Sequence, residues 1–295
     1  MIRILASGGL GNQLFIWNLA HNLENKYKCR IEIVFPKSGS DRVCEILLLE
    51  DFCDHQIKVT VSNRLNLAFG FLSRVKNKSS ALGRMLMAMF SVVETQLPSD
   101  TIDFSKNPPR FIRGYFQSPK LVEETLHIYK DELLTATETF AENSKYWSSA
   151  LATEKMLHIR RGDFIQNKDT VGLLTVEYFS NQVEKDEKVI IFTDARSEDP
   201  EILSNFPNSL VLGTDSLDTW SSFSLLSHAG QLVASNSTFS WWAGVISLMR
   251  GGTVTAPQPW TLTNVYGDNY LEFEKFKYVE SNFEEIQNQN EQKWR

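Results

Sequence analysis

The sequence contains few cysteines, and the features that it lacks exclude several classes of protein. The chain has three cysteines, Cys29, Cys44 and Cys53, all in the first fifth of the sequence. Their number is odd, and no two of them form a CxxC motif. This pattern favours buried thiols in a reducing compartment over a disulfide framework or a zinc site. The amino terminus is too short and too interrupted by glycine for a signal peptide. Because no apolar run approaches the roughly 18 residues of a membrane span, we expect a cytoplasmic protein.

The chain also lacks an excess of basic charge. Its net charge of −6 argues against a nucleic-acid partner, and its composition is ordinary for a soluble globular protein. One segment, residues 63–93, differs, because it carries five Lys or Arg residues and no acid and is rich in Met and Phe. It predicts either peripheral contact with the anionic inner face of a membrane, where a lipid-linked acceptor would lie, or two helices with solvated basic faces.

Short β-branched apolar runs alternate with helical patterns along most of the chain. They predict strands at residues 2–6, 30–35, 57–61, 110–115, 155–160, 188–193, 209–213, 231–235 and 252–256. Such alternation is typical of parallel sheets covered by helices on both faces. It becomes regular near residue 155, after a polar stretch. We therefore predict a GT-B-type α/β fold of two doubly wound domains, residues 1–150 and 151–295, with a cleft between them.

The most informative motif runs from His158 to Asp163, HIRRGD, directly after a predicted strand. Ligands bind beyond the carboxyl ends of parallel strands, and a guanidinium fits the oxygens of a phosphate. Because adjacent side chains point to different sides, at most one of Arg160 and Arg161 can aim at a diphosphate. The other would pair with an acid such as Asp163 and hold the loop. The alternative interpretation is a surface salt-bridge cluster.

A second polar motif, SNSTFSWWAG at residues 235–244, also follows a predicted strand. Its hydroxyls would cap the following helix and leave backbone N–H groups facing an anion. The alternative is an ordinary N-cap beside a packed tryptophan pair, and we expect Trp241 and Trp242 in the core. If both strands belong to one sheet, this loop lies near the loop that follows His158.

A glycine-rich turn, GGLGNQ at residues 8–13, follows the first predicted strand. It is not the dinucleotide fingerprint, because Leu14 stands where a third glycine is needed, and it lacks the Lys-Ser/Thr of a P-loop. Asn12 and Gln13 offer neutral donors and acceptors to a ligand. No two aspartates stand two residues apart, so the DxD metal clamp of many nucleotide-sugar transferases is missing. Metal-independent chemistry, with Arg160 and a helix amino terminus against a diphosphate, is favoured.

Together with GYFQSPK at 114–120 and IFTDA at 191–195, these motifs resemble, in order and spacing, those of the α-1,2-fucosyltransferases from residue 1 to about residue 260. The resemblance implies a GT-B pair of α/β domains and no metal requirement. It further implies transfer of fucose from GDP-fucose, with inversion, to a hydroxyl such as O-2 of galactose in a surface glycan or O-antigen repeat. The carboxyl-terminal domain would hold the donor and the amino-terminal domain the acceptor.

The resemblance also implies roles for particular residues. Arg160 would be the main β-phosphate ligand, with His158 near the guanosine and Asp163 fixing the loop. Ser237 and Thr238 would bind the diphosphate from the other side. The full set comprises catalytic and substrate-binding residues in both domains: catalytic Arg160, Asp163 and Asn12, and binding His158, Arg161, Gly11, Gln13, Asp194, Ser237 and Thr238.

Two departures from the family pattern concern the donor. Ala195 follows Asp194 where the family has paired acids, and Ser222 stands where an acid can contact the guanine amino group. Asp218, one turn earlier, is a candidate substitute. A transferase of another nucleotide sugar and a non-catalytic nucleotide- or glycan-binding protein are therefore the alternatives. The general base is open between Asp163 and Asp169.

Overall fold

The computed structural model describes residues 1–36, 43–53, 56–62, 92–95, 108–263, 266–267 and 270–284. The predicted basic segment 63–93 lies outside the described residues, except for its last two, which begin a strand. In the part of the chain that is described, no helix combines the length and the apolar character that crossing a membrane requires.

The chain forms two compact units. The first comprises Met1–Thr139 with Leu271–Phe273, and the second Phe140–Tyr270 with Glu274–Arg295. We predicted the boundary near residue 150, but the division falls inside helix α5, Lys130–Glu142. An uninterrupted helix gives no change of composition at the division, so the sequence could not mark it.

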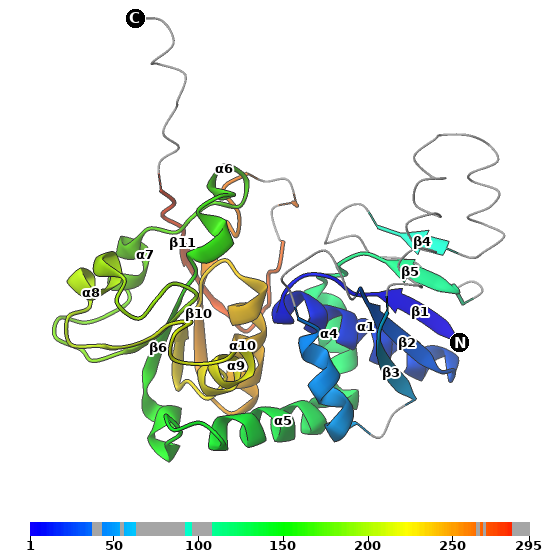
Figure 1. Ribbon diagram of the computed structural model, residues 1–295. Helices are drawn as coiled ribbons and strands as arrows, with labels where there is room; N and C mark the ends of the chain where they lie inside the picture. The colour runs from blue at the N-terminus through cyan, green and yellow to red at the C-terminus, as the bar shows by residue number, and fades with distance from the viewer. Residues whose placement is uncertain are drawn as a thin grey trace, which may run out of the picture. The chain divides into compact units, whose positions relative to one another are not determined.

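The first unit is built on a five-stranded parallel sheet in the order β3-β2-β1-β5-β4 (Figure 1). Its strands are β1 Ile2–Leu5, β2 Ile31–Phe35, β3 Ile57–Val61, β4 Val92–Glu94 and β5 Phe111–Arg113. Its described residues also form α1 Leu10–Tyr27, η1 Glu45–Phe52, α4 Pro119–Thr125, η2 Leu126–Ile128 and most of α5. The chain winds outward from β1 through β2 to β3 and then crosses to the other side of β1. The switch point, where ligands bind in such sheets, lies between β1 and β5.

The second unit contains a six-stranded parallel sheet in the order β11-β10-β9-β6-β7-β8. Its strands are β6 Lys155–Ile159, β7 Ile190–Thr193, β8 Leu210–Leu212, β9 Gln231–Val233, β10 Thr253–Gln258 and β11 Lys277–Glu280. The helices are η3 Ser149–Thr153, η4 Gly162–Phe164, α6 Lys168–Val171, α7 Val176–Ser180, α8 Pro200–Asn205, α9 Thr219–Leu226 and α10 Thr238–Met249. Helices α7 and α8 lie on one side of the sheet and α9 and α10 on the other (Figure 1), as right-handed crossovers in both directions require. The switch point lies between β6 and β9.

The core fixes the two elements that lead into this switch point. Met156, Leu157 and Ile159 of β6 are fully buried, which the near-continuous apolar run of a strand covered on both faces predicts. Trp241 and Trp242 of α10 are also fully buried, so their predicted place in the core is confirmed. Each large apolar side chain of this kind contributes about 1.5–3 kcal/mol by its burial. The ends of β6 and α10 are thus held by rigid packing.

Candidate functional site

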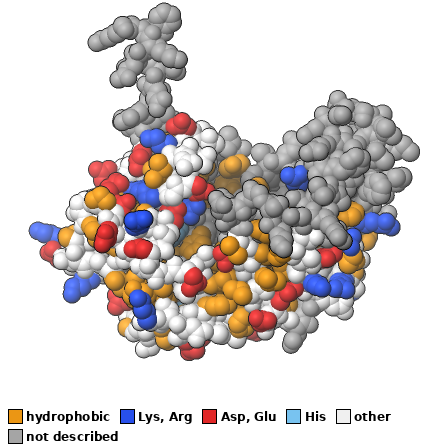
Figure 2. Space-filling model, viewed as in Figure 1, with side chains coloured by type: hydrophobic (Ala, Val, Ile, Leu, Met, Phe, Trp, Pro, Cys, Tyr) orange, Lys and Arg blue, Asp and Glu red, His pale blue; other side chains and the backbone are white. Residues whose placement is uncertain are grey.

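The guanidinium of Arg160 lies just beyond the carboxyl end of β6, between two carboxylates. Its Nη2 is 2.5 Å from Oδ1 of Asp163 and its Nη1 is 3.0 Å from Oδ2 of Asp194. The group also lies over the ring of Phe164, 5.3 Å from the ring centroid. The Arg160 side chain is 26% exposed, so solvent or a ligand can reach it. Elsewhere on this unit Lys or Arg and Asp or Glu side chains also lie intermixed, on the face drawn in Figure 2.

Arg161 points into the protein instead. Its side chain is 4% exposed; Nη1 donates to the backbone oxygen of Leu174 at 2.8 Å, and Nη2 lies 3.4 Å from a carboxylate oxygen of Glu201. The predicted pairing of Arg161 with Asp163 is wrong, because the inward side chain meets Glu201 while Asp163 pairs with Arg160. The expectation that only one of the two arginines is available to a phosphate agrees with this arrangement. Arg161 anchors the loop.

Asp194, at the end of β7, connects to this loop at three points. Its Oδ1 accepts the backbone N–H of Arg161 at 2.6 Å, and its Oδ2 pairs with Arg160. The third point is Gly162, where a Cβ atom would stand only 2.0 Å from Oδ2 of Asp194. A larger residue at position 162 would therefore force the Asp194 carboxylate to move. Together these contacts fix the direction in which the Arg160 side chain leaves the backbone.

His158 joins the two polar loops of the second unit. Its side chain is 4% exposed, its Nδ1 is 2.9 Å from Oγ of Ser235, and its ring stacks on Phe239 with centroids 5.1 Å apart. Because β6 also pairs with β9 directly, the prediction that the two motifs lie close together is confirmed. The contacts of His158 with Ser235 and Phe239 hold β6 to the start of α10, and its predicted approach to a guanosine moiety stays a prediction.

The buried position of His158 also controls its charge. Burial, and secondarily the positive charge of Arg160, lowers the pKa of His158 to about 3. The imidazole is therefore neutral near pH 7, which leaves the positive charge of this site to Arg160 and to the helix that follows Ser237.

We expect this depressed pKa to make the free energy of unfolding decrease as the pH is lowered. The unfolded chain gains a proton at His158 near pH 6.5, whereas the folded chain gains it only near pH 3, so His158 contributes a loss of stability that begins below about pH 6.5. At pH 5 the contribution is about 2 kcal/mol. Urea unfolding from pH 7.5 to 4.5 should show a shallower pH dependence in His158→Gln than in the exposed control His127→Gln. Equal slopes in the two variants would contradict the assignment.

Helix α10 begins at Thr238 with a capped amino terminus. Ser237 is its N-cap, as predicted, and accepts the backbone N–H of Phe239 at 3.3 Å. Asn236, just before it, donates from Nδ2 to the backbone oxygens of Val171 and Gly172 at 3.2 and 3.0 Å. Such a terminus carries partial positive charge and suits an anion. We did not predict the role of Asn236, which fixes the α10 terminus to the loop after α6.

Polar groups also meet at the switch point of the first unit. Gly8 adopts a φ of +87°, and a Cβ there would stand 2.4 Å from Nδ2 of Asn12. Oδ1 of Asn12 accepts from Nε2 of Gln117 at 2.5 Å, which joins the turn after β1 to the turn after β5. Gln117 was not predicted as a site residue, although it lies in the GYFQSPK motif. The order of the strands, which brings β1 beside β5, explains the contact.

Gln13 has a different position from the one we predicted. Its side chain is fully buried. Its Nε2 donates to the backbone oxygens of Gly8 and Val43, both at 2.9 Å, and its Oε1 accepts the backbone N–H groups of Glu45 and Ile46 at 2.8 and 3.2 Å. The predicted role in ligand binding is therefore corrected, because the amide is occupied by backbone groups. Gln13 ties the start of η1 to α1, and the neighbouring Gly11 is buried as well.

Asp218, the candidate substitute for a guanine-binding acid, caps helix α9. Its Oδ1 accepts the backbone N–H of Ser221 at 2.9 Å and its Oδ2 accepts the hydroxyl of the same residue at 2.6 Å. Both carboxylate oxygens are thus used within the first turn of the helix. This capping role accounts for Asp218 without a nucleotide.

The three cysteines differ in their exposure. All three are free thiols, but only Cys44 is buried, whereas Cys29 and Cys53 are partly exposed. The expectation of buried thiols thus holds for one of the three.

Comparison with known proteins places the chain in a family. Residues 1–273 match Glycosyl transferase family 11. The chain belongs to this family. As a family 11 glycosyltransferase, it is an enzyme that uses a nucleotide-sugar donor and a glycan acceptor.

Two Escherichia coli proteins are similar to this family 11 glycosyltransferase over most of their length. One, O-antigen biosynthesis glycosyltransferase WbnK, is 24% identical over 88% of this chain and 94% of its own. The other, an α-1,2-colitosyltransferase, is 28% identical over 86% of this chain and 90% of its own.

The fold is also found in solved structures. The E. coli ADP-heptose lipopolysaccharide heptosyltransferase II superposes with a TM-score of 0.50 over 94% of this chain and 89% of its own, at 9% identity. With two parallel α/β sheets, the enzyme has the predicted GT-B-type fold.

Proposed function

We propose that this enzyme transfers fucose from GDP-fucose to a glycan hydroxyl, with inversion at the anomeric carbon. The acceptor would be O-2 of galactose in an O-antigen repeat or a similar surface glycan. The observation that carries the proposal is the part-exposed Arg160 guanidinium beyond the carboxyl end of β6, a strand that pairs with β9, after which the capped amino terminus of α10 begins. The names of the two E. coli relatives support a role in O-antigen synthesis and a 1,2-linkage.

In the proposed reaction, negative charge grows on the departing diphosphate as the sugar–oxygen bond breaks. Arg160 and the backbone N–H groups at the start of α10, with the hydroxyls of Ser237 and Thr238, would stabilise that charge. One well-placed donor of this kind contributes about 3–4 kcal/mol. These groups supply the positive charge that a metal ion supplies in other transferases, so we propose that the donor site needs no metal.

The two carboxylates that hold Arg160 would have different roles. Asp163 is 40% exposed and Asp194 is 19% exposed, and ion pairs with solvent-exposed groups contribute at most about 1 kcal/mol. We therefore propose that a phosphate displaces Asp163, while Asp194 keeps its hold on the guanidinium and on the loop. Asp163 then holds the guanidinium only until the phosphate binds, and its released carboxylate stays a candidate for the general base. Asp169, exposed in α6, remains the other candidate for the base.

The first unit would present the acceptor. Asn12, oriented by Gln117, offers an amide that can hydrogen-bond a sugar hydroxyl. The second unit would hold the donor through the Arg160 loop and α10. We thus propose the same assignment of acceptor and donor to the two domains as in the sequence analysis, with the bounds of the two units taken from the structure.

A second donor is favoured by one specific observation. The relative with 28% identity is named as a colitosyltransferase, so a sugar other than fucose is a candidate for this chain as well. The capping role of Asp218 and the presence of Ser222 also leave guanine without the acid that the family pattern supplies. The nucleotide and the sugar must therefore be tested separately.

The test has two arms. In the first, thermal shift with GDP, UDP, CDP and dTDP should show stabilisation by GDP alone, and stabilisation by UDP instead would overturn the GDP assignment. In the second, GDP release from GDP-fucose should rise when galactosides are added. Binding of GDP without release would favour another sugar, and binding without turnover of any GDP-sugar would favour a binding protein.

A further inference from the structure

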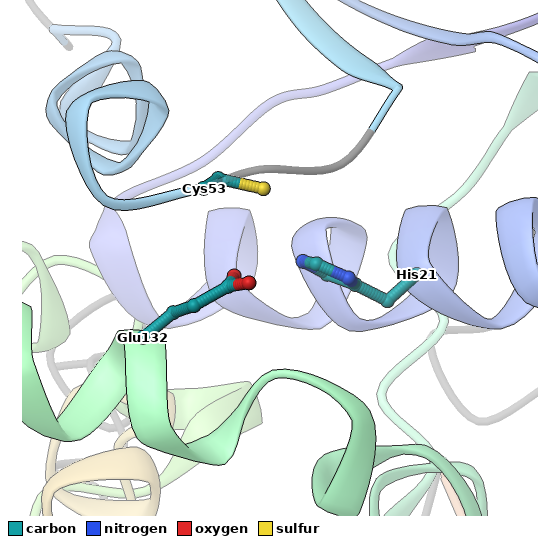
Figure 3. Close-up of side chains that lie close together, drawn as sticks. All are labelled: His21, Cys53 and Glu132. Atoms are coloured by element: carbon teal, nitrogen blue, oxygen red, sulfur yellow. The ribbon is translucent and has the colours of Figure 1, made fainter.

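Three potential metal ligands meet in the first unit, outside the site described above. His21 comes from α1, Cys53 follows η1, and Glu132 comes from α5; their ligand atoms all lie within 4.8 Å of one another. Figure 3 shows the three side chains pointing toward a common space from three separate elements. We propose that this cluster binds a structural zinc ion.

The chemistry of the three groups favours Zn²⁺ over harder cations. Zinc binds a thiolate sulfur at about 2.3 Å, an imidazole nitrogen at about 2.0–2.1 Å and a carboxylate oxygen at about 2.0–2.2 Å. Two such atoms on a tetrahedral ion are about 3.3–3.8 Å apart, so the cluster needs only small side-chain movements to close on an ion. Mg²⁺ and Ca²⁺ prefer oxygen ligands throughout, and a thiolate disfavours them. On binding, the thiol of Cys53 releases its proton and its sulfur takes the metal.

Neighbouring side chains already hold the imidazole in place. The ring of His21 stacks on Tyr129 at 4.3 Å between centroids, with planes 15° apart, and meets Trp17 edge-on at 5.1 Å. The hydroxyl of Tyr129 in turn donates to Oδ1 of Asn18 at 2.8 Å. A ring fixed in this way loses little conformational freedom when a metal binds, which is the role that outer-shell contacts have in metal sites.

Two of the three ligands are partly exposed, so water can reach the cluster and supply a fourth ligand. His21 is fully buried, whereas Cys53 and Glu132 are partly exposed. An ion can therefore enter from the side of the thiol and the carboxylate, and water can complete a tetrahedral shell. The ion would tie the end of η1 to α1 and α5, just as Gln13 ties the start of η1 to α1. Because the ion would join three elements of the first unit, we expect it to support the stability of that unit. This inference does not depend on the proposed donor.

Metal content tests the proposal directly. The full-length protein, purified without chelator or metal-affinity resin and dialysed against metal-free buffer, should retain about one zinc per chain by plasma mass spectrometry. Cys53→Ser and Glu132→Gln should each lower the affinity for zinc at least about tenfold, and Cys29→Ser should leave it unchanged. Loss of zinc at equal extent in Cys29→Ser, or no bound zinc in the wild type after reconstitution, would overturn the site.

Thiol reactivity gives a second measurement that needs no variant and no activity. Cys29 and Cys53 are both partly exposed, whereas Cys44 is buried. Stoichiometric zinc added to the metal-free protein should slow alkylation of Cys53 by iodoacetamide at least about tenfold, because the metal-bound sulfur is blocked. Cys29 in the same sample is the internal control. An unchanged rate at Cys53 would contradict zinc binding even if a variant failed to fold.

Discussion

Replacing Arg160 with alanine should lower turnover by more than about a hundredfold, because a donor aimed at growing negative charge contributes about 3–4 kcal/mol to the transition state. The guanidinium lies just beyond the carboxyl end of β6, one of the two strands that border the switch point, and is held by Asp163 and Asp194. The measurement is the rate of nucleoside diphosphate release from the donor sugar, with circular dichroism and thermal unfolding to show that the variant folds.

Matched variants separate the charge from the shape of Arg160. Arg160→Lys keeps a positive charge but loses the planar fork that meets two oxygens at once, so it should restore only part of the rate. Arg196→Ala removes an exposed arginine from the loop after the neighbouring strand β7 and should leave the rate within about twofold, since surface charges act weakly at a distance. An Arg160→Ala protein that folds and keeps near-normal turnover would show that another cation neutralises the leaving group.

The strands were predictable from the sequence where they carry a continuous or alternating apolar pattern. Every run of β-branched residues that we assigned to a strand forms one: β6 is apolar because both of its faces are covered, and the edge strand β3 begins with alternating buried and exposed residues. Among the described residues, the strands that we missed are Val92–Glu94 and Lys277–Glu280, and both lie at sheet edges. An edge strand is stabilised by pairing on one side only, and its side chains need not be apolar.

The site was predictable as a location but not as a set of contacts. We expected the loop before Thr238 to lie near the loop after His158 if both strands belong to one sheet; β6 and β9 do pair, and His158 contacts Ser235. Which acid pairs with which arginine depends on side-chain direction at the end of β6, and residue spacing carries no such information. For the same reason Gln13 resembled a ligand contact in the sequence although backbone groups of distant residues surround it.

The cluster of His21, Cys53 and Glu132 shows most clearly which kind of site cannot be predicted from the sequence. Metal sites are found in sequences by ligands that recur at short spacing, such as CxxC. Here the three residues are far apart in the chain, and only the packing of α1, η1 and α5 brings them together. The sequence therefore argued against a zinc site at the same cysteine where the structure suggests one.

Introducing a single methyl group at position 162 should cost about a hundredfold in turnover. A Cβ atom there would stand 2.0 Å from Oδ2 of Asp194, so the carboxylate must move. Its movement breaks the contact with the Arg161 backbone and the ion pair with Arg160, and the Arg160 side chain loses its fixed direction. A misplaced group at a reacting centre lowers the reaction rate by about two orders of magnitude. The clash itself lowers the free energy of unfolding by only about 1–3 kcal/mol.

A double-variant cycle distinguishes this mechanism from a general disturbance of the loop. Asp194→Ala removes both the clash and the contacts, so Gly162→Ala should add little further loss in that background, and the double variant should have about the same turnover as Asp194→Ala alone. If the two losses multiply instead, the methyl group acts through the backbone of the loop, and Asp194 is not the group that positions Arg160. Strong coupling would mean that the carboxylate at the end of β7 aims the guanidinium at the end of β6, so that precision at the donor site depends on two adjacent strands.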